Sequence, residues 1–284
     1  MKFSISTASV LAFAFLSTIV KADSYSDAIK EFCDGLEVTA PTESDVFVAG
    51  QNATVTVTRV PNNHEKTITG LDLYSVDSNG TPKYVQNTWA GQYSLNSQAS
   101  ISDDIPTSVA AGYYYYRVWV TNMINGQHGP DCLKTSRTFK VTTSSHTNAD
   151  GVTSYAEHLD DTTYFKPEFA RGCFGLTVQQ PAQDSSYKQG DFVTVLLNRD
   201  SASQTDSLKK VELYKFVDGQ NDESIETIWS GEEGLTNAFS FKDHLNIPSD
   251  KLENGALYYY KVDVSSQVQG ESCSFQSGAF KVTA

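Results

Sequence analysis

The stretch Cys33–Arg59, "CDGLEVTAPTESDVFVAGQNATVTVTR", decides the fold, because the chain repeats it 140 residues later. The later stretch, Cys173–Arg199, reads "CFGLTVQQPAQDSSYKQGDFVTVLLNR", and Cys, Gly, Leu, Val, Pro, Gly and the final Arg coincide. Further matches follow with small insertions, ending with "FKVT" at Phe139 and again at Phe280. Self-similarity at a fixed spacing is the signature of repeated structure. We therefore interpret the chain as a tandem duplication of one domain.

The repeat divides the chain into four expected segments. They are a signal peptide at residues 1–22, a first β-sandwich domain at 30–143, a linker at 144–170 and a second β-sandwich domain at 171–284. The linker is rich in Ser, Thr, Asp and Asn and has little apolar periodicity. We expect part of it to be draped on the second domain through Tyr164, Phe165 and Phe169.

Each copy has the residue pattern of an all-β domain. The segment "ATVTVT" at Ala53–Thr58 alternates strictly between apolar residues and threonine, as a half-buried strand does. The first copy contains seven predicted strands, at residues 36–40, 52–59, 68–76, 83–89, 98–103, 113–122 and 136–142. Seven short strands separated by turn residues predict an immunoglobulin-like or fibronectin-III-like sandwich.

Four cysteines in a secreted chain are expected to form disulfides. Four cysteines allow three connectivities. The duplication selects one of them, because each copy must have folded before it was copied. The predicted disulfides are Cys33–Cys132 and Cys173–Cys273, and each ties the start of a domain to the approach of its last strand.

The N-terminus has the features of a secretory signal. Lys2 precedes an apolar run from Val10 to Val20, and small residues end at Ala22. No later stretch reaches the ~18 apolar residues of a membrane helix, and "GAFKVTA" at the C-terminus carries no signal for a lipid anchor. We therefore expect a secreted protein, extracellular or in a cell wall, without a membrane anchor.

The charge argues against one class of partner, and two sequons predict glycosylation. The formal net charge of −13 disfavours nucleic acid. Asn52, in "NAT", and Asn79, in "NGT", are sequons for N-glycosylation, which a secreted chain would meet.

The run "AGYYYYRVWV" at Ala111–Val120 raises the question of binding, because aromatic residues fall on both faces of a predicted strand. The second copy reads "GALYYYKVDV", so one face is apolar in both copies and is expected to be core. Tyr113, Tyr115 and Trp119 are aromatic on the other face of the first copy. We hypothesise that these three form a ligand-binding strip, and three roles stay open for it: packing within the molecule, contact with a glycan and contact with a protein. Trp89 and Trp229 occupy matching places and are expected to pack against the sheets.

No catalytic motif accompanies these features. The chain has no G-x-S-x-G, no H-E-x-x-H and no Gly-rich phosphate loop, and its five histidines are scattered. No acid pair recurs in both copies. We therefore expect no catalytic residues, no metal site and no cofactor, and thus not an enzyme.

The repeated segment also carries a family resemblance. Pro41, Phe47 and Gly50 lead into an alternating strand, as do the equally spaced Pro181, Tyr187 and Gly190, and a Gly-Tyr strand and a closing Phe-x-Val follow. This resembles the immunoglobulin-like domain of fungal secreted cell-wall proteins of the killer-toxin-resistance type, needed for β-1,6-glucan assembly, and of their Ser/Thr-rich GPI-anchored relatives.

The resemblance implies a non-enzymatic wall glycoprotein that binds wall polysaccharide or assists the organisation of β-glucan. It carries over no active residues. The family usually has a tryptophan at the end of the second strand, where this chain has Thr58-Arg59 and Asn198-Arg199. The alternative is a secreted protein-binding module, for adhesion or facing a host.

Overall fold

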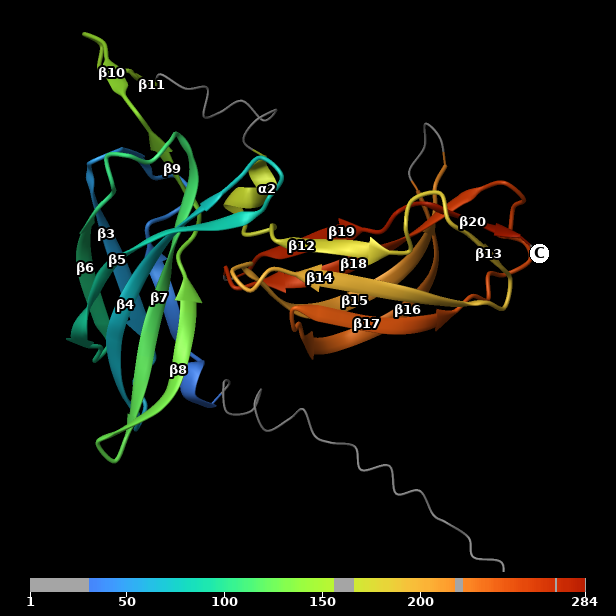
Figure 1. Ribbon diagram of the computed structural model, residues 1–284, viewed down its shortest axis with the longest axis horizontal. Helices are drawn as coiled ribbons and strands as arrows, with labels where there is room; N and C mark the ends of the chain where they lie inside the picture. The colour runs from blue at the N-terminus through green and yellow to red at the C-terminus, as the bar shows by residue number, and fades with distance from the viewer. Residues whose placement is uncertain (1–30, 156–165, 218–221, 269, 284) are drawn as a thin grey trace, which may run out of the picture.

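A computed structural model describes residues 31–155, 166–217, 222–268 and 270–283 of the chain. The predicted signal peptide lies outside the described residues, as do Tyr164 and Phe165 of the linker. The described chain is all-β, as predicted, and forms two units of two sheets each (Figure 1).

The first unit pairs a small sheet with a large one. The small sheet has the order β1 (Leu36–Ala40), β3 (Asn52–Arg59) and β6 (Gln98–Asp104). The large sheet has the order β2 (Val46–Val48), β9 (Phe139–Thr142), β7 (Gly112–Ile124), β4 (Glu65–Val76) and β5 (Pro82–Ser94), and β8 (Gln127–Thr135) also pairs with β7.

The second unit repeats this order strand for strand. Its small sheet is β12 (Leu176–Gln180), β14 (Phe192–Arg199) and β17 (Ala238–His244). Its large sheet is β13 (Ser186–Lys188), β20 (Phe280–Thr283), β18 (Leu257–Ser266), β15 (Thr205–Lys215) and β16 (Glu223–Gly234), with β19 (Ser272–Gln276) paired to β18. The two halves of the chain therefore fold alike, as their sequences do.

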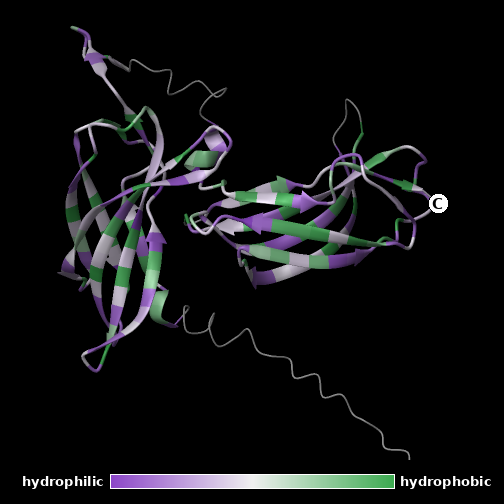
Figure 2. Ribbon diagram, viewed as in Figure 1, coloured by the Kyte–Doolittle hydropathy of each residue, from purple (hydrophilic) through white to green (hydrophobic). Residues whose placement is uncertain are grey.

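Strand alternation places one core between the two sheets of each unit. In β3, Val55 and Val57 are fully buried, while Thr56 lies on the outer face and pairs its hydroxyl with Ser100 of β6 at 3.0 Å. Figure 2 shows the resulting alternation of apolar and polar residues along the strands. The predicted disulfides are confirmed: Cys33–Cys132 and Cys173–Cys273 close loops of matching length, with Cα–Cα distances of 5.5 and 5.3 Å.

The strand predictions need correction at three places, the first being β2 (Val46–Val48), which was not predicted. The predicted strand 136–142 begins only at Phe139, and the preceding β8 was not predicted at all. Gly129 and Pro130 make β8 look like a turn, although proline is tolerated in an edge strand. The β7–β8 turn at Asn125-Gly126 has positive φ at both residues, which is the conformation that Asn-Gly favours between hairpin strands.

The linker also has more structure than expected. Its first part forms a two-stranded hairpin of β10 (Ser145–Thr147) and β11 (Thr153–Tyr155), and it ends in a short helix, α2 (Pro167–Ala170). Figure 1 shows α2 between the two units, beside the turn that joins β4 to β5. Among the described residues, no helix is long and apolar enough to cross a membrane.

Candidate functional site

The structure divides the predicted aromatic strip into two parts. Tyr113 and Tyr115 are only 5% and 0% exposed, because they lie where the second unit meets the first. The expectation that these two rings are available to a ligand is therefore wrong. Trp119 lies further along β7 and is partly exposed.

The apolar centre of this junction joins three segments of the chain. Tyr115 of β7 packs against Phe174, with ring centroids 5.4 Å apart, and Tyr113 lies 6.5 Å from Phe169 of α2. Phe169 and Phe174 also meet edge to face at 6.4 Å. Phe169 thus contacts the start of the second unit, on which the sequence predicted that it would lie, and the first unit as well.

Hydrogen bonds surround this apolar centre. Tyr115 Oη donates to the carbonyl of Ala202 at 2.6 Å, and burial raises the pKa of Tyr115, so the phenol stays protonated as a donor. The Gly175 amide donates to the carbonyl of Gly80 at 2.8 Å. Gly80 has φ +77°, and a Cβ there would lie 3.0 Å from the Phe169 ring, so the turn accepts only glycine without strain. Buried polar pairs of this kind fix one relative orientation of the two units.

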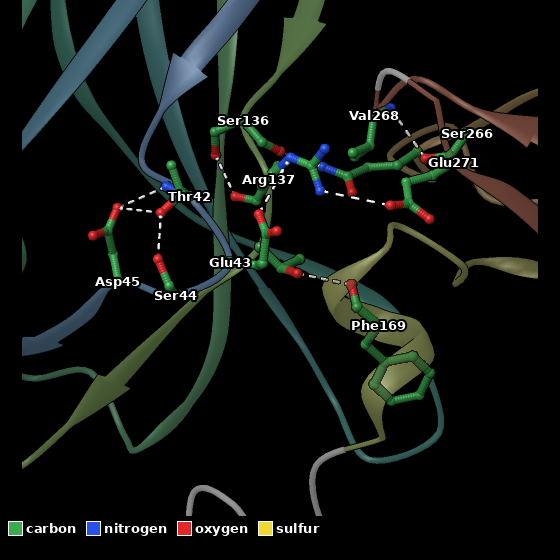
Figure 3. Close-up of polar contacts among 12 residues, drawn as sticks. Thr42, Glu43, Ser44, Asp45, Ser136, Arg137, Phe169, Ser266, Val268 and Glu271 are labelled. Atoms are coloured by element: carbon green, nitrogen blue, oxygen red, sulfur yellow. Dashed lines mark hydrogen bonds and ion pairs between the residues drawn. The ribbon is translucent and has the colours of Figure 1, made fainter.

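The segment between β8 and β9, where strand pairing is interrupted, makes further contacts with the second unit and with α2 (Figure 3). Between β8 and β9, the Ser136 hydroxyl accepts the Tyr116 amide proton at 2.9 Å, which leaves the Ser136 carbonyl free to accept from Gln204 Nε2 at 2.7 Å. Thr138 Oγ1 donates to the carbonyl of Phe169 at 2.8 Å. Figure 3 shows Arg137 reaching Glu43 of its own unit, at 3.2 Å, and Glu271 of the second unit, at 3.7 Å.

Trp119 belongs to a second group of side chains, on the outer face of the same large sheet. We call this group the platform. It consists of Asp72 and Tyr74 from β4, Tyr84 and Asn87 from β5, and Arg117 and Trp119 from β7. The register aligns Tyr84 with Tyr74 and Asn87 with Asp72 across adjacent strands, so the residues form rows across the sheet.

Asp72 holds the polar centre of the platform. It is 8% exposed and accepts from Trp119 Nε1 at 2.6 Å and from Asn87 Nδ2 at 2.9 Å. The indole is therefore held by a charge-assisted hydrogen bond with one edge toward the carboxylate. Its Cδ1 lies only 3.4 Å from where a Cβ of Gly70 would be, so the ring covers a residue without a side chain.

The aromatic part of the platform lies beside this centre. The Arg117 guanidinium carbon is 5.6 Å from the Tyr74 ring centroid and 6.0 Å from that of Trp119, and Arg117 Nη1 donates to Tyr74 Oη at 3.2 Å. The Tyr84 ring meets Tyr74 edge to face at 5.5 Å and is 57% exposed. Flat rings next to ordered hydrogen-bonding groups suit a ligand with both apolar and hydroxyl surfaces.

The second unit carries ion pairs on the corresponding face. Lys210 replaces Gly70 and pairs with Glu212 at 2.8 Å, which raises the pKa of Lys210. Asp263 replaces Trp119 and lies 3.7 Å from Lys261. The exposed Ser224 replaces Tyr84. Two contacts recur in both units. Tyr214 stacks on Tyr259 at 5.6 Å, as Tyr74 stacks on Tyr115 at 5.4 Å. Lys261 Nζ lies 5.8 Å from the Tyr214 ring centroid, in the place of Arg117 over Tyr74.

The remaining predicted residues are accounted for individually. Trp89 and Trp229 pack, partly buried, against the two cores, and each fits over a glycine two residues later, Gly91 and Gly231. Asn52 and Asn79 are exposed. Within the described ranges, no three His, Cys, Asp or Glu side chains gather as metal ligands.

Sequence reasoning missed most of the junction, and of the six platform residues it proposed only Trp119 for a site. Phe174 had a usable signal, because the residue after the first cysteine is Asp34 in one copy and Phe174 in the other. Tyr84 and Asn87 had none, because their relation to Trp119 depends on the order of strands in the sheet. Compared with known proteins, the chain matches no protein-family model and no curated protein.

Proposed function

We propose that this protein is a secreted, non-enzymatic fungal cell-wall glycoprotein whose platform binds wall polysaccharide. Its two units would be immunoglobulin-like domains held in one orientation by the junction. Such a protein presents a polysaccharide chain on a fixed scaffold and thereby assists the organisation of β-glucan.

The strand order supports the immunoglobulin-like assignment. Each unit has a small sheet of the first, third and sixth strands against a larger sheet, and its core lies between the two. Apart from the parallel pairs β2–β9 and β13–β20, the pairings are antiparallel. Two largely antiparallel sheets packed in this way over about 100 residues are typical of immunoglobulin and fibronectin-III domains. The confirmed disulfides are consistent with an oxidising, extracellular environment.

The platform carries the proposal, because it is present in only one of two units that fold alike. A feature required by the scaffold would recur in both, as the buried tyrosine face does. Tyr84 and Trp119 have no aromatic counterpart in the second unit, so the scaffold does not account for them. Asp72 and Arg117 are opposite charges next to flat rings, which favours a neutral hydroxylated chain over a strongly charged ligand.

Binding to insoluble polysaccharide tests the proposal directly. Wild type should sediment with insoluble β-glucan, and Tyr84→Ala and Arg117→Ala should each weaken binding by about tenfold, equivalent to about 1.4 kcal/mol. Ser224→Ala and Lys261→Ala are matched controls in the second unit and should bind like wild type. Tyr84 is largely exposed, so its truncation leaves the core intact. Wild type remaining in the supernatant, or full binding by Arg117→Ala, would contradict the proposal.

A protein ligand is the second candidate, because Tyr, Trp and Arg are also the residues enriched at protein interfaces. It predicts that the same two variants leave sedimentation with polysaccharide unchanged while weakening capture of an extracellular protein. The absence of catalysis is tested separately: incubation with wall extracts should release no reducing sugar.

A further inference from the structure

The sequon at Asn79 lies in a turn that the structure fixes firmly. The carboxylate of Asp77 accepts the backbone amide protons of Asn79 at 2.9 Å and Thr81 at 3.0 Å, and Lys83 lies 3.1 Å from its other oxygen. These bonds use the Asn79 backbone rather than its side chain. The exposed Asn79 amide group is thus presented at the tip of a rigid turn.

This turn is also part of the junction between the two units. Gly80 packs against Phe169 and Phe174, and its carbonyl accepts the Gly175 amide proton at 2.8 Å. A cavity of about 700 Å³ opens beside it. The first unit contributes Asn79 and Thr81 to its lining. The other side of the cavity is lined by Arg171, just before the second unit, and by Asn198, Asn237 and Phe275 of that unit. This volume falls within the roughly 300–1,000 Å³ of sites that hold small ligands.

We propose that Asn79 carries an N-linked glycan whose first sugars occupy this cavity and brace the two domains against each other. In its formation, the Asn79 amide nitrogen attacks the anomeric carbon of a lipid-pyrophosphate-linked oligosaccharide. The nitrogen loses a proton, a C–N bond forms, and the bond to the pyrophosphate leaving group breaks. The inference rests on the proposed secretion, because that donor is met in the secretory pathway.

The lining of the cavity suits the sugar that attaches to asparagine. Hydroxyl and acetamido groups can accept from the Arg171 guanidinium and exchange hydrogen bonds with the amides of Asn198 and Asn237. The ring of Phe275 offers an apolar face for stacking. A glycan rooted in the first domain would thus hold groups of the second.

The other sequon provides a matched control. Asn52 lies on β3 of the small sheet, where its Nδ2 donates to Asp104 at 3.0 Å and its Oδ1 accepts from Ser102 at 2.6 Å. The junction contacts come from the other sheet, from the turns and from α2. A glycan on Asn52 would therefore project from the first domain without touching the second.

Hydrogen exchange on the full chain, secreted from a eukaryotic host, tests the proposal. Glycopeptide mass spectrometry should find Asn79 occupied. In an Asn52→Gln background, the amide of Gly175 should exchange about tenfold more slowly with the glycan than in Asn79→Gln or Thr81→Ala, both of which remove the sequon. Trimming the glycan to its first sugar should retain the protection. Asn52→Gln alone should change nothing at Gly175.

Three results would overturn the inference, and the first two are distinct from failure of the proposed function. If mass spectrometry finds a glycan on Asn52 and none on Asn79, the proposed modification is wrong. If the Gly175 amide exchanges equally fast with and without the glycan, the glycan does not brace the two domains. Both sites bare would also contradict secretion through this pathway. The polysaccharide test depends on the platform instead, and its outcome is read on protein with the Asn79 glycan present.

Discussion

The outer faces of the two large sheets differ in chemistry although the sheets that carry them are alike. On the first, Trp119 donates to Asp72 and covers Gly70. On the second, Lys210 stands where Gly70 is and pairs with Glu212, and Asp263 stands in the place of Trp119. One face presents rings with a fixed polar centre, and the other presents paired opposite charges around the buried Glu212.

The comparison shows which positions the scaffold leaves free. Side chains pointing into the sandwich are apolar in both units, because both must fill a core. Side chains on the outer faces are constrained only by contacts with their neighbours and with ligands, so their identities differ between the two units. The junction follows the same logic, since Tyr115 is covered by the second unit while its counterpart Tyr259 bonds to Asp222 within its own unit.

The disulfides give the largest expected effect, and they should act equally in both units. Replacing Cys33 and Cys132 by serine removes a cross-link between residues 99 apart, and the second pair spans 100. Loops of this length correspond to about 4–5 kcal/mol in the chain-entropy account. Calorimetry of the two double variants should show matching losses in the affected domain. A loss confined to one unit would break the claim of a common scaffold.

The buried tyrosine–aspartate pairs should produce the next largest effect. Tyr116 Oη donates to Asp103 at 2.7 Å and Tyr260 Oη to Asp243 at 2.6 Å, and all four residues are buried. Burial raises the pKa of Asp103, and a phenylalanine at position 116 would leave this acid without its donor. Tyr116→Phe and Tyr260→Phe should each cost about 1–3 kcal/mol in urea unfolding.

A control on the same strand sharpens that measurement. Tyr114 Oη donates to the neutral carbonyl of Ala110 at 2.7 Å, so Tyr114→Phe should cost only about 0.5–1.5 kcal/mol. If Tyr114→Phe costs as much as Tyr116→Phe, the carboxylate is not the reason for the larger value.

The features that could be predicted from the sequence are those with a local residue pattern and those that the duplication repeats in both halves. Alternation in "ATVTVT" placed β3 at Asn52–Arg59, and duplication selected the disulfide pairing among three possibilities. Sequence reasoning failed at β8, where Gly129-Pro130 resembles a turn and only pairing with β7 makes the segment a strand. Tertiary pairing overrides local preference at such an edge.

The candidate sites were only partly predictable for a related reason. The tyrosine run identified the strand and both of its faces, but the burial of Tyr113 and Tyr115 comes from a second unit whose placement no local pattern encodes. The platform needs β5 beside β4 and β4 beside β7, which is a matter of strand order. Comparing the copies position by position identified Trp119, because that method asks only what differs.

The buried Lys66 should make the stability of the first unit depend on pH in a way that the second unit does not share. Its ammonium donates to the Phe32 carbonyl and to Asn122 Oδ1, whereas the second unit pairs Thr205 with Ser266 at this place in the ladder. Burial, with a smaller contribution from Arg59, lowers the pKa of Lys66 from 10.5 to about 8. Between these values the unfolded chain holds a proton that the folded chain has lost.

Stability should therefore rise with pH from about 8 to about 10.5, by up to about 1.4 kcal/mol per pH unit. Denaturant titrations of wild type and Lys66→Met at pH 7.5, 8.5 and 9.5 isolate this contribution, since the variant lacks the group. Parallel pH profiles for the two proteins would contradict it.

A last pair of variants separates the junction from the rest of the scaffold. Tyr115→Phe and Tyr259→Phe delete the same atom at matching positions, but the first hydroxyl donates to Ala202 in the other unit and the second to Asp222 in its own. Each change should cost about 1–2 kcal/mol, with the larger loss for Tyr259 because its acceptor is charged. Only Tyr115→Phe should speed hydrogen exchange in both units around the junction, since it alone removes a bond between them. If Tyr259→Phe loosened the junction equally, the coupling would run through the whole second sheet rather than through the contact at Tyr115.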